Sequence, residues 1–425
     1  MSQSDAVSRR TFLGATGAVA ATTAMSAASY ARVIGANDRI RVGFVGAGGM
    51  GTAHLAAISK LKGPSNLEPV AVADCWKTRA DQGAQRVGAG QSLTDYRKLL
   101  DIADIDYVTI ATPEHWHSRM TVDALDAGKA VYCEKPMTHS IPQAQAVLKK
   151  QAETKLPVQV GVQSMSDDSY SSAATAIREG VLGQVVQAQI EYVRRYNDQG
   201  PWRDPNISDD TPQPDDLNWS DWLGEAPEVP WNPHHYFEWR NYSIYSGGIC
   251  TDLFIHRITR IMKACELMYP RRVVGMGGIW QWPDGRDLPD NFEMICEYPR
   301  GMTVYVLGTM SNRVGIDHLI RGYRGTMYFT ANGWVAKDKD GQVLAEHKKS
   351  GAEDIHLHHT NLHNHLRKGE LLNCPVELGM AGVAAVNMAN ESWRTGQMMA
   401  WDKVQEKMVP AVSLGEQKFS PEMDA

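Results

Sequence analysis

The sequence feature that most constrains the fold is a glycine-rich loop between a predicted strand and a predicted helix. The segment 39–45, which contains several β-branched residues, leads into the run GAGGMG at 46–51, and a helix is predicted over 52–60. In this G-x-G-x-x-G pattern the first glycine permits a tight turn, the second lets a pyrophosphate approach the backbone, and the third lets the helix pack closely. The loop therefore predicts a nucleotide-binding parallel sheet.

An acidic residue follows where such a sheet contacts the ribose of a nucleotide. A second predicted strand over 68–73 ends at Asp74. A carboxylate in this place accepts hydrogen bonds from the ribose hydroxyls and disfavours a 2′-phosphate. NAD is thus the expected cofactor, with NADP the less favoured one.

Strands and helices continue to alternate along the next part of the chain. Helices are predicted over 93–102 and 118–127, strands over 107–112 and 130–133, and a further helix from about Pro142. This alternation predicts an α/β fold with a doubly wound parallel sheet, in which ligands bind at the loops that follow the strands.

Two of these loops carry polar side chains. One holds Thr112, Pro113 and His117, and the other holds Glu134 and Lys135. The residues alone leave two interpretations of the second loop open, a solvated charge pair before a helix or part of a ligand site.

The first thirty residues have the pattern of an export signal. Arg9 and Arg10 precede a charge-free segment over 11–30 that is rich in Ala, Gly and Thr. A twin-arginine motif in this place predicts a cleaved signal over 1–30 and a periplasmic or otherwise exported protein, with no stable membrane insertion after cleavage. A retained anchor and an ordinary N-terminus are the alternatives, although the segment is weakly apolar for a membrane span.

Charge and cysteine usage exclude several classes of protein. The chain has 43 Lys and Arg against 49 Asp and Glu, a net charge of -6, so it lacks the basic field that nucleic-acid binding requires. The net charge is compatible with a neutral ligand. Six cysteines without a C-x-x-C pair predict buried small side chains rather than a disulfide framework or a zinc site.

The second half of the chain has the alternation of a largely antiparallel sheet. Strands are predicted over 185–193, 273–279, 291–298, 303–307 and 326–330, with turn signals between several of them.

A segment over 196–242 is too rich in proline for regular structure and too aromatic for a disordered linker. Its aromatic side chains either pack a long loop onto the sheet or form platforms for sugar rings. We expect Trp219 and Trp222 to pack, and Trp239 with Arg240 to lie on the substrate side.

Two further groups of residues carry candidate chemistry. Asp252 and His256 are four apart, which on a helix places both side chains on one face, where a carboxylate can fix the tautomer of an imidazole and raise its pKa. A helix-surface hydrogen bond is the alternative.

A histidine-rich segment over 354–366 contains His359 and His363, which could share a metal ion on one helix face. We favour an amphipathic helix with Leu362 and Leu366 inward, and no metal site. The last predicted helix, over 379–396, is expected to be core.

In order and spacing, these blocks resemble the Gfo/Idh/MocA family of glucose–fructose oxidoreductase and inositol dehydrogenase. The residues that carry the resemblance are the 46–51 loop, Asp74, Thr112-Pro113 with His117, Glu134-Lys135-Pro136, and Gly247-Gly248 followed by Asp252 and His256. The resemblance implies a Rossmann domain over 36–160 and an α/β domain over 161–425, with an open, largely antiparallel sheet and C-terminal helices that pack back on the first domain. The substrate then lies between that sheet and the nicotinamide.

The resemblance also implies roles for individual residues. The expected catalytic residues are Lys135, Asp252 and His256, and the expected substrate contacts are Tyr192, Trp239 and Arg240. The expected NAD contacts are Gly46, Gly48, Gly49, Met50, Gly51, Asp74, Thr112, Pro113, His117, Glu134, Lys135 and Gln163.

The implied reaction is hydride transfer from a sugar or polyol carbon to the nicotinamide. His256 is expected to accept the hydroxyl proton, Lys135 to stabilise the developing charge on oxygen, and Glu134 to orient Lys135. Thr259 stands where the family often has an aspartate, which puts substrate contacts near it in doubt.

Two other functions stay open for the same residues. One is an NAD-using glycosidase that acts through transient oxidation and elimination, and the other is a non-catalytic sugar-binding protein. An exported enzyme is further expected to hold its cofactor tightly, and the family implies a homo-oligomer.

Overall fold

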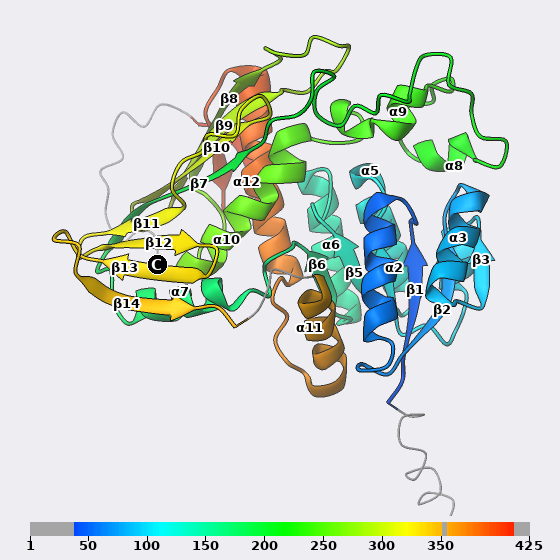
Figure 1. The fold of residues 1–425 in the computed structure, drawn as a ribbon, viewed down its shortest axis with the longest axis horizontal. Coiled ribbons are helices and arrows are strands. Elements are labelled where there is room, and N and C mark those ends of the chain that lie inside the picture. Colours follow the sequence, from blue (N-terminus) through cyan, green and yellow to red (C-terminus); the bar gives the residue numbers. More distant parts are fainter. Residues whose placement is uncertain (1–37, 351–354, 412–425) are drawn as a thin grey trace, which may run out of the picture.

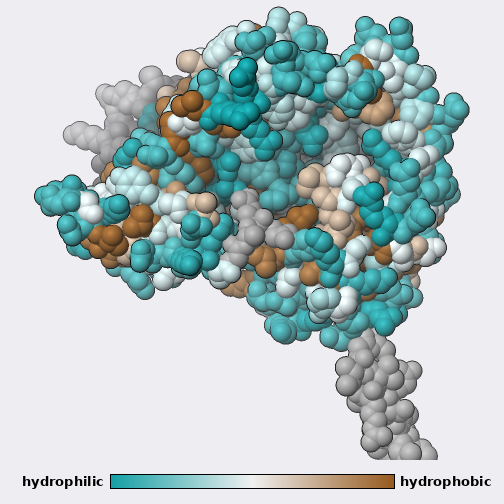
Figure 2. Space-filling view, viewed as in Figure 1, coloured by the Kyte–Doolittle hydropathy of each residue, from teal (hydrophilic) through white to brown (hydrophobic). Residues whose placement is uncertain are grey.

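The structure is a computed structural model that describes residues 38–350 and 355–411. The predicted export signal over 1–30 lies outside the described residues. Two sheets dominate the fold, with helices between them (Figure 1). The face seen in Figure 2 is hollowed between the second sheet and the first domain.

The first sheet is the predicted parallel, doubly wound sheet, with strand order β3-β2-β1-β4-β5-β6. Its strands are β1 (Ile40–Val45), β2 (Leu67–Ala73), β3 (Gln91–Leu93), β4 (Tyr107–Ile110), β5 (Ala130–Glu134) and β6 (Val158–Gly161). The strand order reverses between β1 and β4, and ligands bind at the carboxyl ends of strands at such a point.

Helices connect these strands and cover the sheet. They are α2 (Gly49–Leu61), α3 (Lys77–Val87), α4 (Tyr96–Leu100), α5 (Glu114–Asp126) and α6 (Ile141–Thr154). Two predicted boundaries are wrong. The helix predicted over 93–102 is shorter because Asp95 caps it, accepting the N–H of Arg97, and α5 begins at Glu114 because Pro113 is already in its N-cap position. His117 therefore lies on a helix and not in a loop.

The second sheet is mixed and mostly antiparallel, with strand order β14-β13-β12-β11-β7-β10-β9-β8-β15-β16. Only its β7–β10 pair is parallel among the pairings of the described strands. The strands are β7 (Val185–Val193), β8 (Arg272–Gly278), β9 (Asn291–Tyr298), β10 (Met302–Thr309), β11 (Leu319–Gly322), β12 (Thr326–Thr330), β13 (Gly333–Lys337), β14 (Val343–Lys348), β15 (Met399–Asp402) and β16 (Lys407–Pro410).

One face of this sheet is covered by helices that lie toward the first domain (Figure 1). They are α7 (Asp168–Arg178), the π-helix η2 (Ile249–Phe254), α10 (Ile255–Cys265) and α12 (Val376–Thr395). Strand β10 alternates buried and half-buried residues, so one side of it faces this helical layer. Helix α12 also packs on α6, and α11 (Ile355–Lys368) packs on α2. The two C-terminal helices thus touch the first domain.

The aromatic segment over 196–242 runs from the second sheet to the loops at the carboxyl ends of the strands of the first sheet. It contains α8 (Trp219–Leu223), α9 (Pro233–Phe237) and the 3₁₀ helix η1 (Trp239–Asn241). Trp219 and Trp222 are buried and stack with their ring centroids 4.8 Å apart, so the prediction that they pack is confirmed. A bridge between Trp76 and Leu217 joins the segment to the loop after β2.

The sequence predicts that the cysteines are small buried side chains, and most of them are. All six cysteines are free, and four of them, Cys133, Cys250, Cys296 and Cys374, are buried. Across 38–350 and 355–411, none of the helices is long and apolar enough to cross a membrane.

Candidate active site

The glycine-rich loop after β1 has the shape that a dinucleotide requires. Gly46 has φ +89°, and a Cβ there would lie 2.8 Å from the Ala111 oxygen. A Cβ at Gly51 would lie 2.1 Å from the Gly46 oxygen, whereas one at Gly49 would meet nothing within 4 Å. Helix α2 starts after Gly48 without a side-chain cap, so its first-turn N–H groups are available to a phosphate. These residues fit the pyrophosphate of NAD.

Asp74 lies at the end of β2 but is already used within the protein. Its carboxylate accepts the N–H of Ala47 at 2.8 Å and the N–H of Trp76 at 2.9 Å. Burial raises its pKa against the effect of these bonds. A carboxylate has four lone-pair sites, so the side chain can still accept from a ribose hydroxyl. Arg79, which the sequence did not single out, lies over the ring of Trp76 at 4.6 Å and lines the same end of the pocket.

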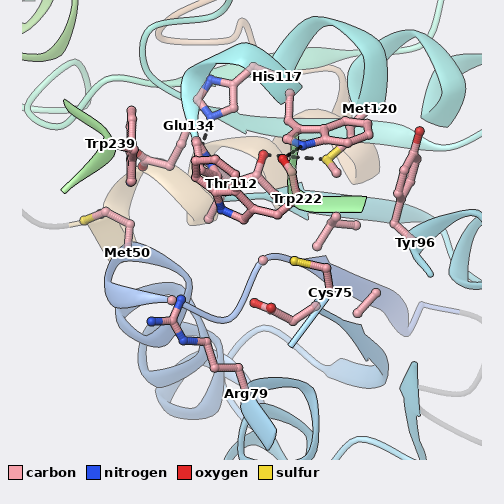
Figure 3. Close-up of a pocket in the computed structure, with 18 of the residues that line it drawn as sticks. Met50, Cys75, Arg79, Tyr96, Thr112, His117, Met120, Glu134, Trp222 and Trp239 are labelled. Atoms are coloured by element: carbon pink, nitrogen blue, oxygen red, sulfur yellow. Dashed lines mark hydrogen bonds between the residues drawn. The ribbon is translucent and has the colours of Figure 1, made fainter. Parts of the chain in front are cut away.

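One pocket runs from this loop to the second domain. In Figure 3 the side chains of Met50, Cys75 and Arg79 lie across the pocket from Trp222 and His117. The pocket brings together most of the predicted site, namely Gly46, Gly48, Gly49, Met50, Asp74, Thr112, Pro113, His117, Glu134, Lys135, Trp239, Arg240 and Asp252. Trp222, Tyr236 and Phe237 from the aromatic segment also line it.

Four predicted site residues lie outside the lining of that pocket: Gly51, Gln163, Tyr192 and His256. Gly51 is buried under the turn of the glycine-rich loop. Gln163 donates to the Glu134 carboxylate at 2.9 Å and so acts through that residue. Tyr192 and His256 lie side by side, with their ring centroids 6.3 Å apart.

Lys135, Asp252 and Arg240 form a buried ionic group at the second-domain end of the pocket. The Lys135 ammonium donates to the Asp252 carboxylate at 2.7 Å and to the Asp252 backbone oxygen at 2.9 Å. Arg240 donates to the same carboxylate oxygen at 3.0 Å. Burial alone would raise the pKa of Asp252, but Lys135 and Arg240 hold it well below its usual range. The two cations therefore share one anion.

The predicted Asp252–His256 partnership is wrong. Residues 249–254 are wound as a π-helix and the α-helix starts only at Ile255, so the two residues do not lie on one regular α-helical turn. No hydrogen bond joins their side chains in the described structure. Asp252 turns its carboxylate to Lys135 and Arg240 instead. Burial, and then the charge of Lys135, lower the pKa of His256 well below its usual value, where a rise was expected.

The predicted orientation of Lys135 by Glu134 is also wrong. Glu134 accepts hydrogen bonds from Gln163 and from the imidazole of His54, each at 2.9 Å. The other ring nitrogen of His54 lies 2.9 Å from Nε2 of His359. His54 was not predicted, because it comes from α2, on the other side of the β1–β4 switch point, and carries no motif.

His117 joins two loops of the pocket. Its ring nitrogens lie 2.6 Å from the Pro136 oxygen and 2.9 Å from the Thr112 oxygen. Carbonyl oxygens only accept, so both nitrogens must donate, which requires the charged imidazolium. Burial opposes that charge, but Cys133 and the two carbonyls raise the pKa of His117 to about 9. The polar atoms of His117 thus hold protein together and are not free for a cofactor.

The histidine-rich segment is a buried helix, α11. Leu362 is buried as predicted, and His358 donates to the Val160 oxygen at 2.8 Å. His363 lies 3.0 Å from the Tyr107 hydroxyl. Within the described residues, no three or more His, Cys, Asp or Glu side chains gather so that they could hold a metal ion. The histidines serve the packing of α11 on the first sheet.

Two family models match this chain. One, described as the oxidoreductase family with an NAD-binding Rossmann fold, matches residues 40–162. The other, described as the C-terminal alpha/beta domain of the same oxidoreductase family, matches residues 139–273, so together they span more than half of the chain. The chain belongs to the Gfo/Idh/MocA oxidoreductase family.

Individual relatives agree with this assignment. Levoglucosan dehydrogenase of Pseudarthrobacter phenanthrenivorans is 29% identical over 40% of this chain and 43% of that protein. Inositol 2-dehydrogenase of Rhizobium meliloti is 32% identical over 40% of this chain and 52% of that protein. The chain thus spans about half the length of the curated relatives it matches.

Solved structures show the same fold. A structure of levoglucosan dehydrogenase in complex with NADH superposes with a TM-score of 0.68 at 18% identity, covering 85% of this chain and 98% of that one. For this member of the Gfo/Idh/MocA family, the Rossmann domain and the mostly antiparallel second sheet are therefore shown. NAD is the cofactor that the matched Rossmann fold binds.

Thr259, where this family member departs from the common pattern, is turned inward. Its hydroxyl donates to the Ile255 oxygen at 2.6 Å, and the residue is buried.

Glu114, which was not predicted as a site residue, lies at the carboxyl edge of the first sheet. Its buried carboxylate accepts from Ser246 and from Thr251, each at 2.8 Å, and so anchors η2 to the first domain. Its place after β4 was the only signal in the sequence.

Proposed function

We propose that this protein is an NAD-dependent dehydrogenase that oxidises a secondary alcohol of a sugar or polyol. The observation that carries the proposal is the Lys135–Asp252 ion pair, because it links the end of β5, beside the dinucleotide loop, to the second domain at one pocket. The names of relatives such as inositol 2-dehydrogenase supply the substrate class.

When bound, NAD supplies the acceptor for a hydride. The Lys135 ammonium would donate to the substrate oxygen and stabilise the negative charge that develops on it. Asp252 holds that ammonium in place, since the lysine donates to it twice, and Arg240 donates to the same carboxylate. His256 is kept neutral by burial and by the charge of Lys135, so it is able to accept the hydroxyl proton.

The experiment is a panel of sugars and polyols incubated with the purified protein and NAD. We expect NADH to form, seen by its absorbance, with one oxidised product per NADH. A protein that binds NAD but forms NADH with none of the panel would contradict the proposal and support a sugar-binding protein on the same fold.

A second candidate is an NAD-using glycosidase. A relative in Shewanella putrefaciens named glycosyl hydrolase family 109 protein is 26% identical over 44% of this chain and 46% of that protein. The same Lys135 and His256 would then serve a transient oxidation before elimination. Sugar release from a glycoside without net NADH would favour this reading over the dehydrogenase.

We also propose export by the twin-arginine route with NAD held tightly. The support is the Arg9-Arg10 motif ahead of a charge-free segment. Replacing both arginines with lysine is expected to retain the protein in the cytoplasm, as measured by cell fractionation. NAD that exchanges freely from the protein purified from the periplasm would argue against tight binding.

The partner in solution is proposed to be a second copy of the chain. Met276 and Ile295 lie on neighbouring strands β8 and β9 and are 68% and 44% exposed. Sedimentation of the wild-type protein and of Ile295→Lys tests this, and a monomeric wild-type protein would refute it.

A further inference from the structure

Positively charged side chains gather around Tyr192, next to the proposed reaction site. The guanidinium carbons of Arg194 and Arg257 lie 4.7 Å and 4.6 Å from the centre of its ring. The ring of His256 lies 6.3 Å from the same ring. The ring of Tyr192 therefore lies beside His256, the proposed proton acceptor, and contacts two arginines.

Arg257 has neither an ion pair nor a partner for its Nε within the described part of the chain. That Nε is buried, and the guanidinium lies over the ring of Tyr192. The carboxylate of Glu191 lies near enough to act on Arg257 electrostatically, but no ion pair joins the two, and Glu191 accepts the N–H of Val193 at 2.9 Å. A buried donor without a partner is costly unless a ligand or a water molecule pairs with it.

The other charged side chains near Tyr192 include more cations than carboxylates paired with them. Lys135 and Arg240 share the single carboxylate of Asp252. Arg194 donates to the Tyr192 hydroxyl, which is a neutral acceptor. Four cations, Lys135, Arg194, Arg240 and Arg257, thus lie around Tyr192 and the adjoining end of the pocket, although the chain as a whole is acidic. Among the described residues, the ion pairs of these four cations reach a single carboxylate, that of Asp252.

We propose that the substrate is an acidic sugar or polyol whose carboxylate or phosphate group binds Arg257, with Arg194 on the same tyrosine as a second donor. Guanidinium groups bind both anions in a bidentate manner, and such charge-assisted bonds are about twice as strong as neutral ones. This inference rests on the proposed function for the reaction, and it replaces the expectation of a neutral carbohydrate.

The test measures binding to the NAD-loaded protein by calorimetry. The probes are D-glucuronate, D-galacturonate and D-glucose 6-phosphate, each compared with its neutral parent sugar. At least one acid is expected to bind about tenfold or more tightly than its parent, with an affinity that falls as salt rises. The two uronates and the phosphate ester separate the two sources of negative charge. If none of the three binds more tightly than its parent, the proposal is overturned.

Arg257→Gln is the decisive variant, with Arg86→Gln on the exposed face of α3 as the matched control. Arg257→Gln is expected to bring the acid to within about twofold of its parent while leaving the parent's own affinity unchanged, and Arg86→Gln is expected to change neither. Equal weakening of acid and parent would mean that Arg257 only packs on Tyr192 and would refute the proposal. Should Arg257→Gln fail to fold, Arg257→Lys keeps the charge and is expected to retain part of the preference.

The outcome for the reaction is recorded separately as NADH formation. Preferential binding of an acid without any NADH would reject the proposed dehydrogenase but keep the anionic ligand. NADH formed equally well from an acid and its neutral parent would keep the dehydrogenase and reject the anionic substrate.

Discussion

The two ends of the pocket are built in different ways. The dinucleotide end comes from successive loops of one parallel sheet, after β1, β2 and β4. The reaction end takes Lys135 from β5's carboxyl end, Asp252 from a π-helix and Arg240 from the aromatic segment. The first end depends on backbone shape within a short stretch of chain, whereas the second depends on charges that only the folded chain brings together.

The largest expected effect is at the reaction end. Lys135→Ala is expected to lower kcat/KM about 10³-fold, because it removes the donor to the substrate oxygen and leaves Asp252 with Arg240 alone. NAD affinity is expected to change much less. Steady-state kinetics and NAD titration check this, with Lys60→Ala on the exposed face of α2 as the control. Turnover within a factor of about two of the wild type would remove Lys135 from the catalytic set.

The dinucleotide end is tested by two glycines that differ in their surroundings. Gly51→Ala places a Cβ 2.1 Å from the Gly46 oxygen, and is expected to lower the free energy of unfolding by about 2–3 kcal/mol. Gly49→Ala meets nothing within 4 Å and is expected to change that free energy by less than about 1 kcal/mol, toward higher stability. Denaturant titration measures both. An equal change in the free energy of unfolding at the two positions would show that the close backbone contact at Gly51 does not constrain the glycine-rich loop.

A smaller effect is expected at Asp74. Asp74→Asn removes a negative charge but keeps one acceptor oxygen, so the preference for NAD over NADP is expected to narrow by about tenfold. Asp81→Asn, an exposed acid on α3, is the control. Competition between the two cofactors measures the preference, and an unchanged ratio would mean that Arg79 alone sets it.

The smallest effect concerns pH. Burial and the charge of Lys135 lower the pKa of His256, so its neutral, proton-accepting form persists below the ordinary histidine value of about 6.5. We expect kcat/KM to vary less than about threefold between pH 8 and 6, and to fall only at lower pH as the imidazole takes up a proton. A half-maximal rate near pH 6.5 or above would contradict the neutral imidazole at this end of the pocket.

The sequence predicted the first domain well because its signals are local. The glycine-rich loop, the alternation of strands and helices and the placement of Asp74 all depend on residues within a few turns of each other. The strands over 291–298 and 326–330 matched because strict alternation marks a strand with one buried face.

The partners of the charged residues were not predictable in the same way. Glu134 pairs with His54 and Asp252 pairs with Lys135, across separations of 80 and 117 residues. The π-helix at 249–254 carries no recognised sequence signal, and it overrode the spacing argument for Asp252 and His256. Arg257 attracts attention only when the folded chain shows no ion pair to it among the described residues.

The sequence by itself determined the dinucleotide fold, because glycine conformations and hydrophobic periodicity act over short stretches of chain. The tertiary structure decided which charges pair and where cations remain in excess, because Coulomb interactions depend on distance in space and on burial, not on position along the chain. A net charge of -6 for the whole protein therefore coexists with a cationic substrate side around Tyr192.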